Sequence, residues 1–189
     1  MKPLWPLARA LAFFGLAGSA GLAHALTVTQ LQALLQAQPK QDARYEETRE
    51  SPWLSAPVNT RGTLHVTAQA LEKHVQVPRQ ETWRLLADRL EWQGPGGERK
   101  QILFSQAPAL QGLADVTRRA LAGELVPLER EFNIVVSGDE HVWSARLSPL
   151  TPVLARQLDG VELQGVGGHL RVLIVTERQG ERTTTRILP

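Results

Sequence analysis

Cysteine is absent from the 189-residue chain. No disulfide can therefore staple the fold, no thiolate can act as a nucleophile or a metal ligand, and no cysteine can carry a lipid anchor. Long apolar runs are also missing, because no stretch reaches the roughly 18 consecutive apolar residues that a membrane span needs. These two absences exclude thiol chemistry and predict a protein without stable membrane insertion.

Clustered positive charge is missing too. The chain has 21 Lys and Arg against 19 Asp and Glu, a formal net charge of +2. Nucleic-acid binding through counterion release requires basic residues gathered on one surface, and the sequence shows no such cluster. We therefore expect no nucleic-acid partner.

Catalytic and metal-binding motifs are absent as well. The chain contains neither a G-x-S-x-G nucleophile elbow nor an H-E-x-x-H zinc helix. The histidines beyond the first 25 residues lie at expected strand positions among polar neighbours, without the spacing of metal ligands: His65, His74, His141 and His169. The sequence predicts that the protein is not an enzyme and that it has no cofactor and no metal site.

The first 25 residues have the layout of a cleavable signal peptide. Lys2 and Arg9 precede an apolar run over residues 10–22, and a small-x-small ending falls at residues 23–25. This layout predicts export and cleavage after Ala25; the alternative is an uncleaved anchor, although the apolar run is too short to span a membrane. We expect residues 1–25 to be the signal peptide and residues 26–189 to form a single domain.

Apolar and polar residues alternate through residues 61–94. Leu64 and Val66 have one parity, and the pattern continues with Trp83 and Leu85 and then with Leu90 and Trp92. Side chains along a strand point to opposite faces with period two, so this alternation predicts antiparallel strands that share one apolar face.

Further strands are expected on both sides of this stretch. Residues 43–50 are polar on both faces apart from Tyr45, which suits a strand at the edge of a sheet. The remaining segments with strand character are 100–105, 131–137, 141–147, 161–164, 170–177 and 183–188.

Three short amphipathic helices are predicted between the strands. They cover residues 28–37, where a threonine can cap the helix, residues 108–122, which Pro108 opens and Gly123 ends, and residues 149–158. Each helix has one apolar stripe, and three short helices cannot cover both faces of the sheet. The predicted fold class is therefore α+β: a strongly curved antiparallel sheet that forms an unclosed half β-barrel with a lid of short α-helices.

The tryptophans allow two interpretations. Trp83, Trp92 and Trp143 fall on the apolar parity of their strands, where they could fill a packed core or line an apolar pocket. Trp53 and Leu54 lie in a proline-bearing loop, where they could contact a partner or a lid, or tuck under the sheet edge.

Taken together, these features resemble the LolA-like family, the periplasmic outer-membrane lipoprotein carrier proteins and their relatives. The resemblance runs over residues 26–189 and rests on the order and spacing of several weak motifs. They are the strand ARYEETRE, the G-x-L-x-V motif from Gly62 to Val66, the aspartate turn at Asp88 leading into Leu90-Glu91-Trp92, Val161-Glu162-Leu163, Leu170-Arg171-Val172 and Gly180-x-x-Thr183.

The resemblance implies a periplasmic carrier, or chaperone, that binds the acyl chains of a lipoprotein or other lipid in an apolar cavity. Such a carrier shuttles its cargo from an inner-membrane releasing or exporting complex to a LolB-like acceptor at the outer membrane, and we expect it to be a monomer. The alternatives with the same fold are a lipid-sensing or lipoprotein-sensing regulator and an accessory protein to a lipid exporter or acyltransferase pathway.

The expected lining of the lipid-binding cavity combines strand parity with the resemblance, which places Leu71 at the cavity mouth. The lining residues are Leu64, Val66, Leu71, Val75, Val77, Trp83, Leu85, Leu90, Trp92, Phe104, Leu110, Leu113, Phe132, Ile134 and Trp143. One departure from the family concerns the lid. The family has an arginine followed by proline in the turn after G-x-L-x-V, and that arginine helps to hold the lid shut, whereas this chain has Ala68 and Gln69.

Overall fold

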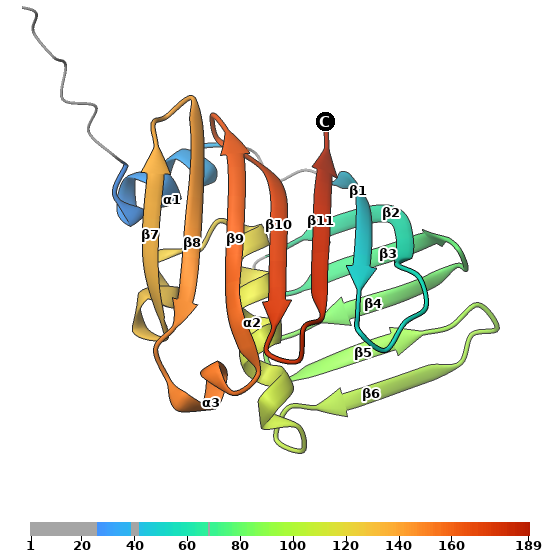
Figure 1. The fold of residues 1–189 in the computed structure, drawn as a ribbon. Helices are drawn as coiled ribbons and strands as arrows, with labels where there is room; N and C mark the ends of the chain where they lie inside the picture. The colour runs from blue at the N-terminus through green and yellow to red at the C-terminus, as the bar shows by residue number, and fades with distance from the viewer. Residues whose placement is uncertain (1–25, 39–41, 68) are drawn as a thin grey trace, which may run out of the picture.

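The computed structural model describes residues 26–38, 42–67 and 69–189. The elements within these ranges follow the order helix, six strands, helix, two strands, helix and three strands, with a short 3-10 helix η1 after the second α-helix (Figure 1). Their bounds are α1 (Val28–Gln36), β1 (Ala43–Glu50), β2 (Val58–Val66), β3 (Leu71–Val77), β4 (Glu81–Leu85), β5 (Arg89–Gln93), β6 (Arg99–Leu103), α2 (Pro108–Ala122), η1 (Val126–Arg130), β7 (Phe132–Gly138), β8 (Val142–Pro149), α3 (Pro152–Ala155), β9 (Leu158–Val166), β10 (His169–Glu177) and β11 (Arg182–Leu188).

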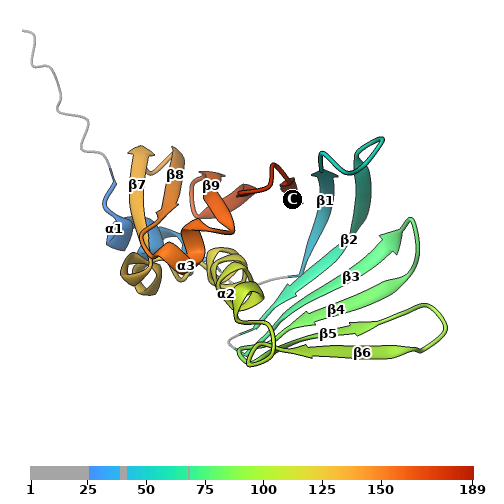
Figure 2. The same cartoon turned by 60° about the horizontal axis from the view of Figure 1, so that its bottom comes forward.

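The strands of these described ranges form a single 11-stranded antiparallel sheet in the order β6-β5-β4-β3-β2-β1-β11-β10-β9-β8-β7. Within β1–β6 and within β7–β11, each strand pairs with the next one in the chain, and the pairing of β1 with β11 joins the two groups. The sheet is curved and unclosed, with β6 and β7 as its outer strands (Figures 1 and 2). The predicted fold class, an unclosed half-barrel with short helices, is confirmed.

The helices pack against one end of the sheet. Side chains from α1, α2, η1 and α3 meet those of β7 to β10 in a continuous core, in which Leu31, Val116, Leu147 and Leu163 are buried. We call β7–β10 the closed wall and β1–β6 the open wall. Figure 2 shows α2 between the two walls, with β3 to β6 extending away from it.

Local sequence signals explain the helix bounds. The Thr27 hydroxyl accepts the Gln30 N–H at 3.2 Å, and the Gln30 side chain accepts the Thr27 N–H at 2.9 Å, which forms a capping box at the start of α1. Helix α2 begins at Pro108 and ends at Gly123, whose φ of 69° is the left-handed conformation that glycine adopts most easily. The predictions for residues 28–37 and 108–122 are thus confirmed to within one residue.

The prediction that residues 43–50 form an edge strand is wrong. Strand β1 lies in the interior of the sheet between β2 and β11. Its inward polar side chains have partners on neighbouring strands: Glu47 accepts hydrogen bonds from Lys73 Nζ at 2.5 Å and from Thr185 Oγ1 at 2.9 Å. A polar strand can therefore occupy a central position, because its charges are compensated across the sheet.

Candidate functional site

The concave face of the open wall carries a row of apolar side chains. Residues directly opposite each other in antiparallel strands share a face, and the register aligns Val66 with Leu71, Leu71 with Leu85, Leu85 with Leu90, and Leu90 with Ile102. We call these five residues the apolar row. Leu71 and Val66 also pack in the small cluster that includes Leu121 of α2, so the row faces the helix side of the sheet.

A second row runs beside the first, two residues further along each strand. The register aligns Leu64 with Lys73, Lys73 with Trp83, Trp83 with Trp92, and Trp92 with Lys100. The centroids of the two indole rings are 6.3 Å apart with an interplanar angle of 56°, and Lys100 Nζ lies 5.3 Å from the Trp92 ring centroid. We call these five residues the mixed row.

The two rows are partly open to solvent although most of them belong to interior strands. Trp83, Leu85, Leu90 and Trp92 are only half-buried, and Ile102 on the outer strand β6 is 43% exposed. A side chain on an interior strand remains this accessible only when no second layer covers its face. The open wall therefore presents contiguous apolar surface, which in a folded protein marks an interaction or ligand site.

Two hollows border helix α2. One, of about 480 Å³, lies at its C-terminal end and is lined by Leu35, Leu64, Val66, Leu121 and Ile187 among others. The other, of about 410 Å³, lies beside its N-terminal half, and its lining includes Phe104 of the β6–α2 connection, Gln111 and Leu154. Apolar side chains of the open wall thus line free space at the C-terminal end of α2.

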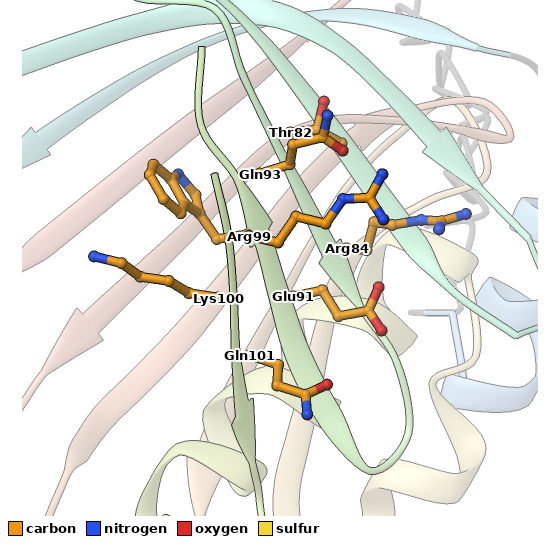
Figure 3. A pocket seen from close by; sticks show the side chains of 8 residues that line it. Thr82, Arg84, Glu91, Gln93, Arg99, Lys100 and Gln101 are labelled. Carbon is orange, nitrogen blue, oxygen red and sulfur yellow. The ribbon is translucent and has the colours of Figure 1, made fainter. Parts of the chain in front are cut away.

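A third hollow, of about 500 Å³, has a different character. Most of its lining side chains are polar: Thr82, Arg84, Glu91, Gln93, Arg99, Lys100 and Gln101 (Figure 3). Thr82, Arg84, Glu91 and Gln93 have the opposite parity to Trp83 and Trp92, so this hollow lies largely on the convex face. Figure 3 shows Lys100 directed away from Arg84 and Arg99. The hollow does not suit an acyl chain.

The structure brings most of the predicted cavity residues onto the concave face of the open wall. The residues that lie there together are Leu64, Val66, Leu71, Val75, Trp83, Leu85, Leu90 and Trp92. Val77 is not part of this group, because it lies at the end of β3, beyond a shift in the β2–β3 register, and is 37% exposed.

Other predicted residues belong to the closed wall. Phe132 and Trp143 are buried in its packed core, where Ile134 and Leu113 also pack. The Trp143 indole N–H donates to the Gly167 carbonyl at 2.8 Å, and Gly165 leaves the space that this indole ring occupies. Phe132 and Trp143 have almost no surface left for a ligand in this conformation.

The last two predicted positions lie at the N-terminal end of α2. Phe104 is buried, and its N–H donates to the Asp88 carbonyl at 2.9 Å, which fixes the chain just before the helix. Leu110 is half-buried in the first turns of α2.

Three polar residues of the concave face did not appear among the predicted site residues. Glu81 accepts the indole N–H of Trp83 at 3.1 Å and that of Trp92 at 2.9 Å. Lys73 and Glu47 form the ion pair described above. The parity could have identified two of them, because Lys73 alternates in step with Leu71 and Val75, and Glu81 in step with Trp83.

The turn that carries an arginine in the family includes Ala68, which lies outside the described residues. Among the residues described, glutamines of α1 hold the segment that follows α2: Gln32 Oε1 accepts the Val126 N–H at 2.9 Å, and Gln36 Nε2 donates to the Gly123 carbonyl at 3.4 Å. These bonds tie the lid helices to one another.

Two of the histidines lie on the convex side of the open wall. His65 contacts Asp42, and that hydrogen bond raises the pKa of His65. His74 Nδ1 lies 3.2 Å from Thr82 Oγ1. Within the described ranges, no three His, Cys, Asp or Glu side chains gather as a metal site would require, and no helix is long and apolar enough to cross a membrane.

The fold and the site define a class of protein in which a curved, unclosed sheet has helices over one wall and uncovered apolar surface on the other. The chain belongs to the family described as outer membrane lipoprotein carrier protein LolA-like, which it matches over residues 20–188.

Solved structures to which this chain is similar include the LolA superfamily protein NE2245 from Nitrosomonas europaea, with 9% identity, 87% of this chain and 93% of that chain covered, and a TM-score of 0.44. Another is a DUF1329 family protein from Desulfovibrio piger, with 9% identity, 85% and 90% covered, and a TM-score of 0.40. A comparison with curated proteins finds no match.

Proposed function

We propose that this chain is a periplasmic carrier that binds the acyl chains of a lipoprotein or other lipid and moves them from the inner to the outer membrane without catalysis. Membership of the LolA-like family supports this function. The observation that carries the proposal is the apolar row of Val66, Leu71, Leu85, Leu90 and Ile102. Two of its members, Leu85 and Leu90, lie on interior strands and yet remain partly exposed.

The energy of acyl binding fits such a surface. Each buried methylene contributes about 0.8 kcal/mol, so an acyl chain of about a dozen carbons offers roughly 10 kcal/mol before the costs of association. Part of this is realised when a chain lies along the apolar row, and the two tryptophan rings add flat apolar area beside it. The ligand surface in this proposal is the open wall, and the closed wall serves as its support.

Helix α2 is the part of the lid that lies next to this surface. Its Leu121 packs against the closed core and also against the cluster of Tyr45, Leu64 and Leu71 in the open wall. In the proposed cycle α2 shifts to admit the acyl chain between itself and the open wall. Short helices with one apolar stripe move more readily than core strands.

The rest of the proposal concerns export and partners. Residues 1–25 act as a cleavable signal peptide, and residues 26–189 form one domain that works as a monomer. The donor is an inner-membrane releasing or exporting complex, and the acceptor is a LolB-like protein at the outer membrane.

One observation favours the sensing alternative. Trp53 is 76% exposed and Leu54 is 41% exposed, both in the loop between β1 and β2. An exposed tryptophan beside a leucine is a common anchor in protein interfaces. A regulator with this fold would use the loop to pass a ligand signal to a partner protein, and so would an accessory protein to a lipid exporter or acyltransferase pathway.

Native mass spectrometry of the protein purified from the periplasm, followed by organic extraction, tests the carrier proposal. We expect added mass that extracts as acyl-chain material. A protein that carries no extractable lipid and also fails to take up a fluorescent acyl probe would contradict the proposal.

A pair of variants locates the binding surface. Leu90→Ser places a hydroxyl in the middle of the apolar row and should weaken uptake of the acyl probe. Val135→Ser is the matched control, because Val135 is an apolar strand residue of the closed wall that is 53% exposed. Equal effects of the two substitutions would show that the probe does not bind at the open wall.

A further inference from the structure

The concave face holds charged groups that an acyl chain alone does not require. Lys73 Nζ lies 2.5 Å from Glu47 Oε1 and 5.0 Å from the centroid of the Tyr45 ring. The side chains are only 22% exposed for Lys73 and 16% for Glu47. Burying such a pair costs desolvation energy that its attraction often does not recover. An ion pair kept on an apolar face therefore calls for a functional explanation.

Lys73 has hydrogen-bonding capacity left over. An ammonium group has three donors, and within the described part of the chain Glu47 is the acceptor that Lys73 contacts. Its neighbours in the mixed row are Leu64 and Trp83, which cannot accept a strong hydrogen bond through their side chains. The remaining donors are thus available to an acceptor on a ligand.

The electrostatic balance of the face disfavours a negatively charged ligand. Glu47 compensates the charge of Lys73 at close range. Glu81 is held by the two indole N–H groups, and among the described residues no Lys, Arg or His lies within 4.0 Å of it. Lys100 is exposed on the outer strand β6 and lies over the Trp92 ring. The charge of Lys73 is therefore neutralised by Glu47, while the charge of the Glu81 carboxylate has no cationic partner among the described residues.

We propose that the concave face selects a neutral acyl ester or amide, whose carbonyl oxygen accepts a hydrogen bond from Lys73 while the chain lies along the apolar row. This inference rests on the proposed acyl-binding function. The two rows are two residues apart along each strand, which corresponds to roughly 7 Å at about 3.3 Å per residue. This spacing places the polar end of an acylated ligand at Lys73 and the first methylenes of its chain at the apolar row.

Competition between ligands with the same chain tests the proposal. A neutral naphthylamine probe is bound to the purified protein and displaced by palmitate, by monopalmitoylglycerol or by a palmitoylated peptide amide at a pH where palmitate is ionised. We expect the ester and the amide to bind about tenfold more tightly than palmitate, which corresponds to about 1.4 kcal/mol. Tighter binding of the peptide than of the glyceride would identify a lipidated protein as the source of the acyl group.

The opposite results separate this proposal from the one it rests on. If palmitate binds as tightly as the two neutral ligands, acyl binding stands and the neutral-carbonyl site is wrong. If none of the three ligands displaces the probe, both proposals fail.

Two variants assign the selectivity to named groups. The double variant Glu47→Gln/Lys73→Met removes the donor without leaving a carboxylate alone on the face, and we expect it to lose the preference for ester over acid. Glu81→Gln should lower the ratio of ester affinity to palmitate affinity, because removing this negative charge should improve palmitate binding. Glu72→Gln is the control, since Glu72 lies beside Lys73 on the opposite face of β3 and pairs with Arg84. An unchanged ratio in the double variant and in Glu81→Gln would overturn the proposal, whatever their thermal stability.

Discussion

The two walls should differ in how much a lost leucine side chain costs. Leu163 in β9 is completely buried in the core of the closed wall, whereas Leu90 in β5 is half-buried on the open wall. We therefore compare Leu163→Ala with Leu90→Ala, two identical chemical changes on the inward face of the same sheet.

The expected magnitudes follow from burial. Leucine to alanine in a filled core costs about 2 to 5 kcal/mol, because the lost transfer energy is increased by the cavity that remains. Full burial of a leucine side chain is worth about 1.5 to 3 kcal/mol, and Leu90 is only partly removed from water. On an open face no cavity forms, so Leu90→Ala should cost about 1 kcal/mol or less. The two variants should differ by at least about 1 kcal/mol in the free energy of unfolding.

Urea unfolding followed by circular dichroism measures this difference, provided that the slope of unfolding free energy against urea is the same for both variants. The unaltered protein should gain stability with a bound acyl ligand, about 2.7 kcal/mol at a concentration 100 times the dissociation constant. Leu90→Ala should lose part of that gain, and Leu163→Ala should keep it. Equal losses of stability in the two variants without ligand would refute the reasoning, because they would mean that the open wall is covered in solution.

Three further predictions concern other parts of the molecule. Burial raises the pKa of Tyr45 above its ordinary value near 10, so tyrosine ionises at lower pH in the unfolded chain than in the folded one, and the free energy of unfolding should fall as pH rises above about 10. Tyr45→Phe should reduce the slope of the free energy of unfolding against pH. The absorbance of the chain's single tyrosine reports its titration. Gly165→Ala should cost about 1 to 3 kcal/mol in thermal or urea unfolding, because the new methyl group would overlap the buried Trp143 ring and approach the His169 carbonyl, and an unchanged midpoint would contradict this packing. Trp53→Ser should change stability by no more than about 0.5 kcal/mol, since the side chain is 76% exposed. It should also remove the emission of the most exposed tryptophan among residues 26–189; a larger loss of stability would mean that the loop packs in solution.

The sequence predicts those features of the fold that depend on near neighbours in the chain. Helix α1 follows from its capping threonine and a single apolar stripe, and the shared apolar face of β2 to β5 follows from alternation. The position of β1 could not be predicted in this way. Glu47 is compensated by Lys73, 26 residues away, and by Thr185, 138 residues away, so a strand that is polar by composition is central by pairing.

The candidate site shows the same division. Alternation places Leu64, Trp83, Leu85 and Trp92 on one face, and the structure agrees. Parity cannot tell which part of a continuous inner face the helices cover, because that depends on where the chain turns back after η1. Trp143 has the same sequence signature as Trp83 and Trp92, yet it lies in the packed core of the closed wall.

The pairing of β1 with β11 also determines when the 11-stranded sheet can be completed during folding. Apart from the pairing of β1 with β11, the strands within β1–β6 and within β7–β11 pair only with strands next to them in the chain. Each group can therefore assemble by local contacts while the chain is synthesised from its N-terminus. The hydrogen-bonded pairing that joins the two groups uses the seven residues of β11, which is the last of these strands in chain order. Until β11 pairs with β1, the two walls are separate sheets, and their apolar faces are exposed to solvent and to any chaperone bound to the unfolded chain.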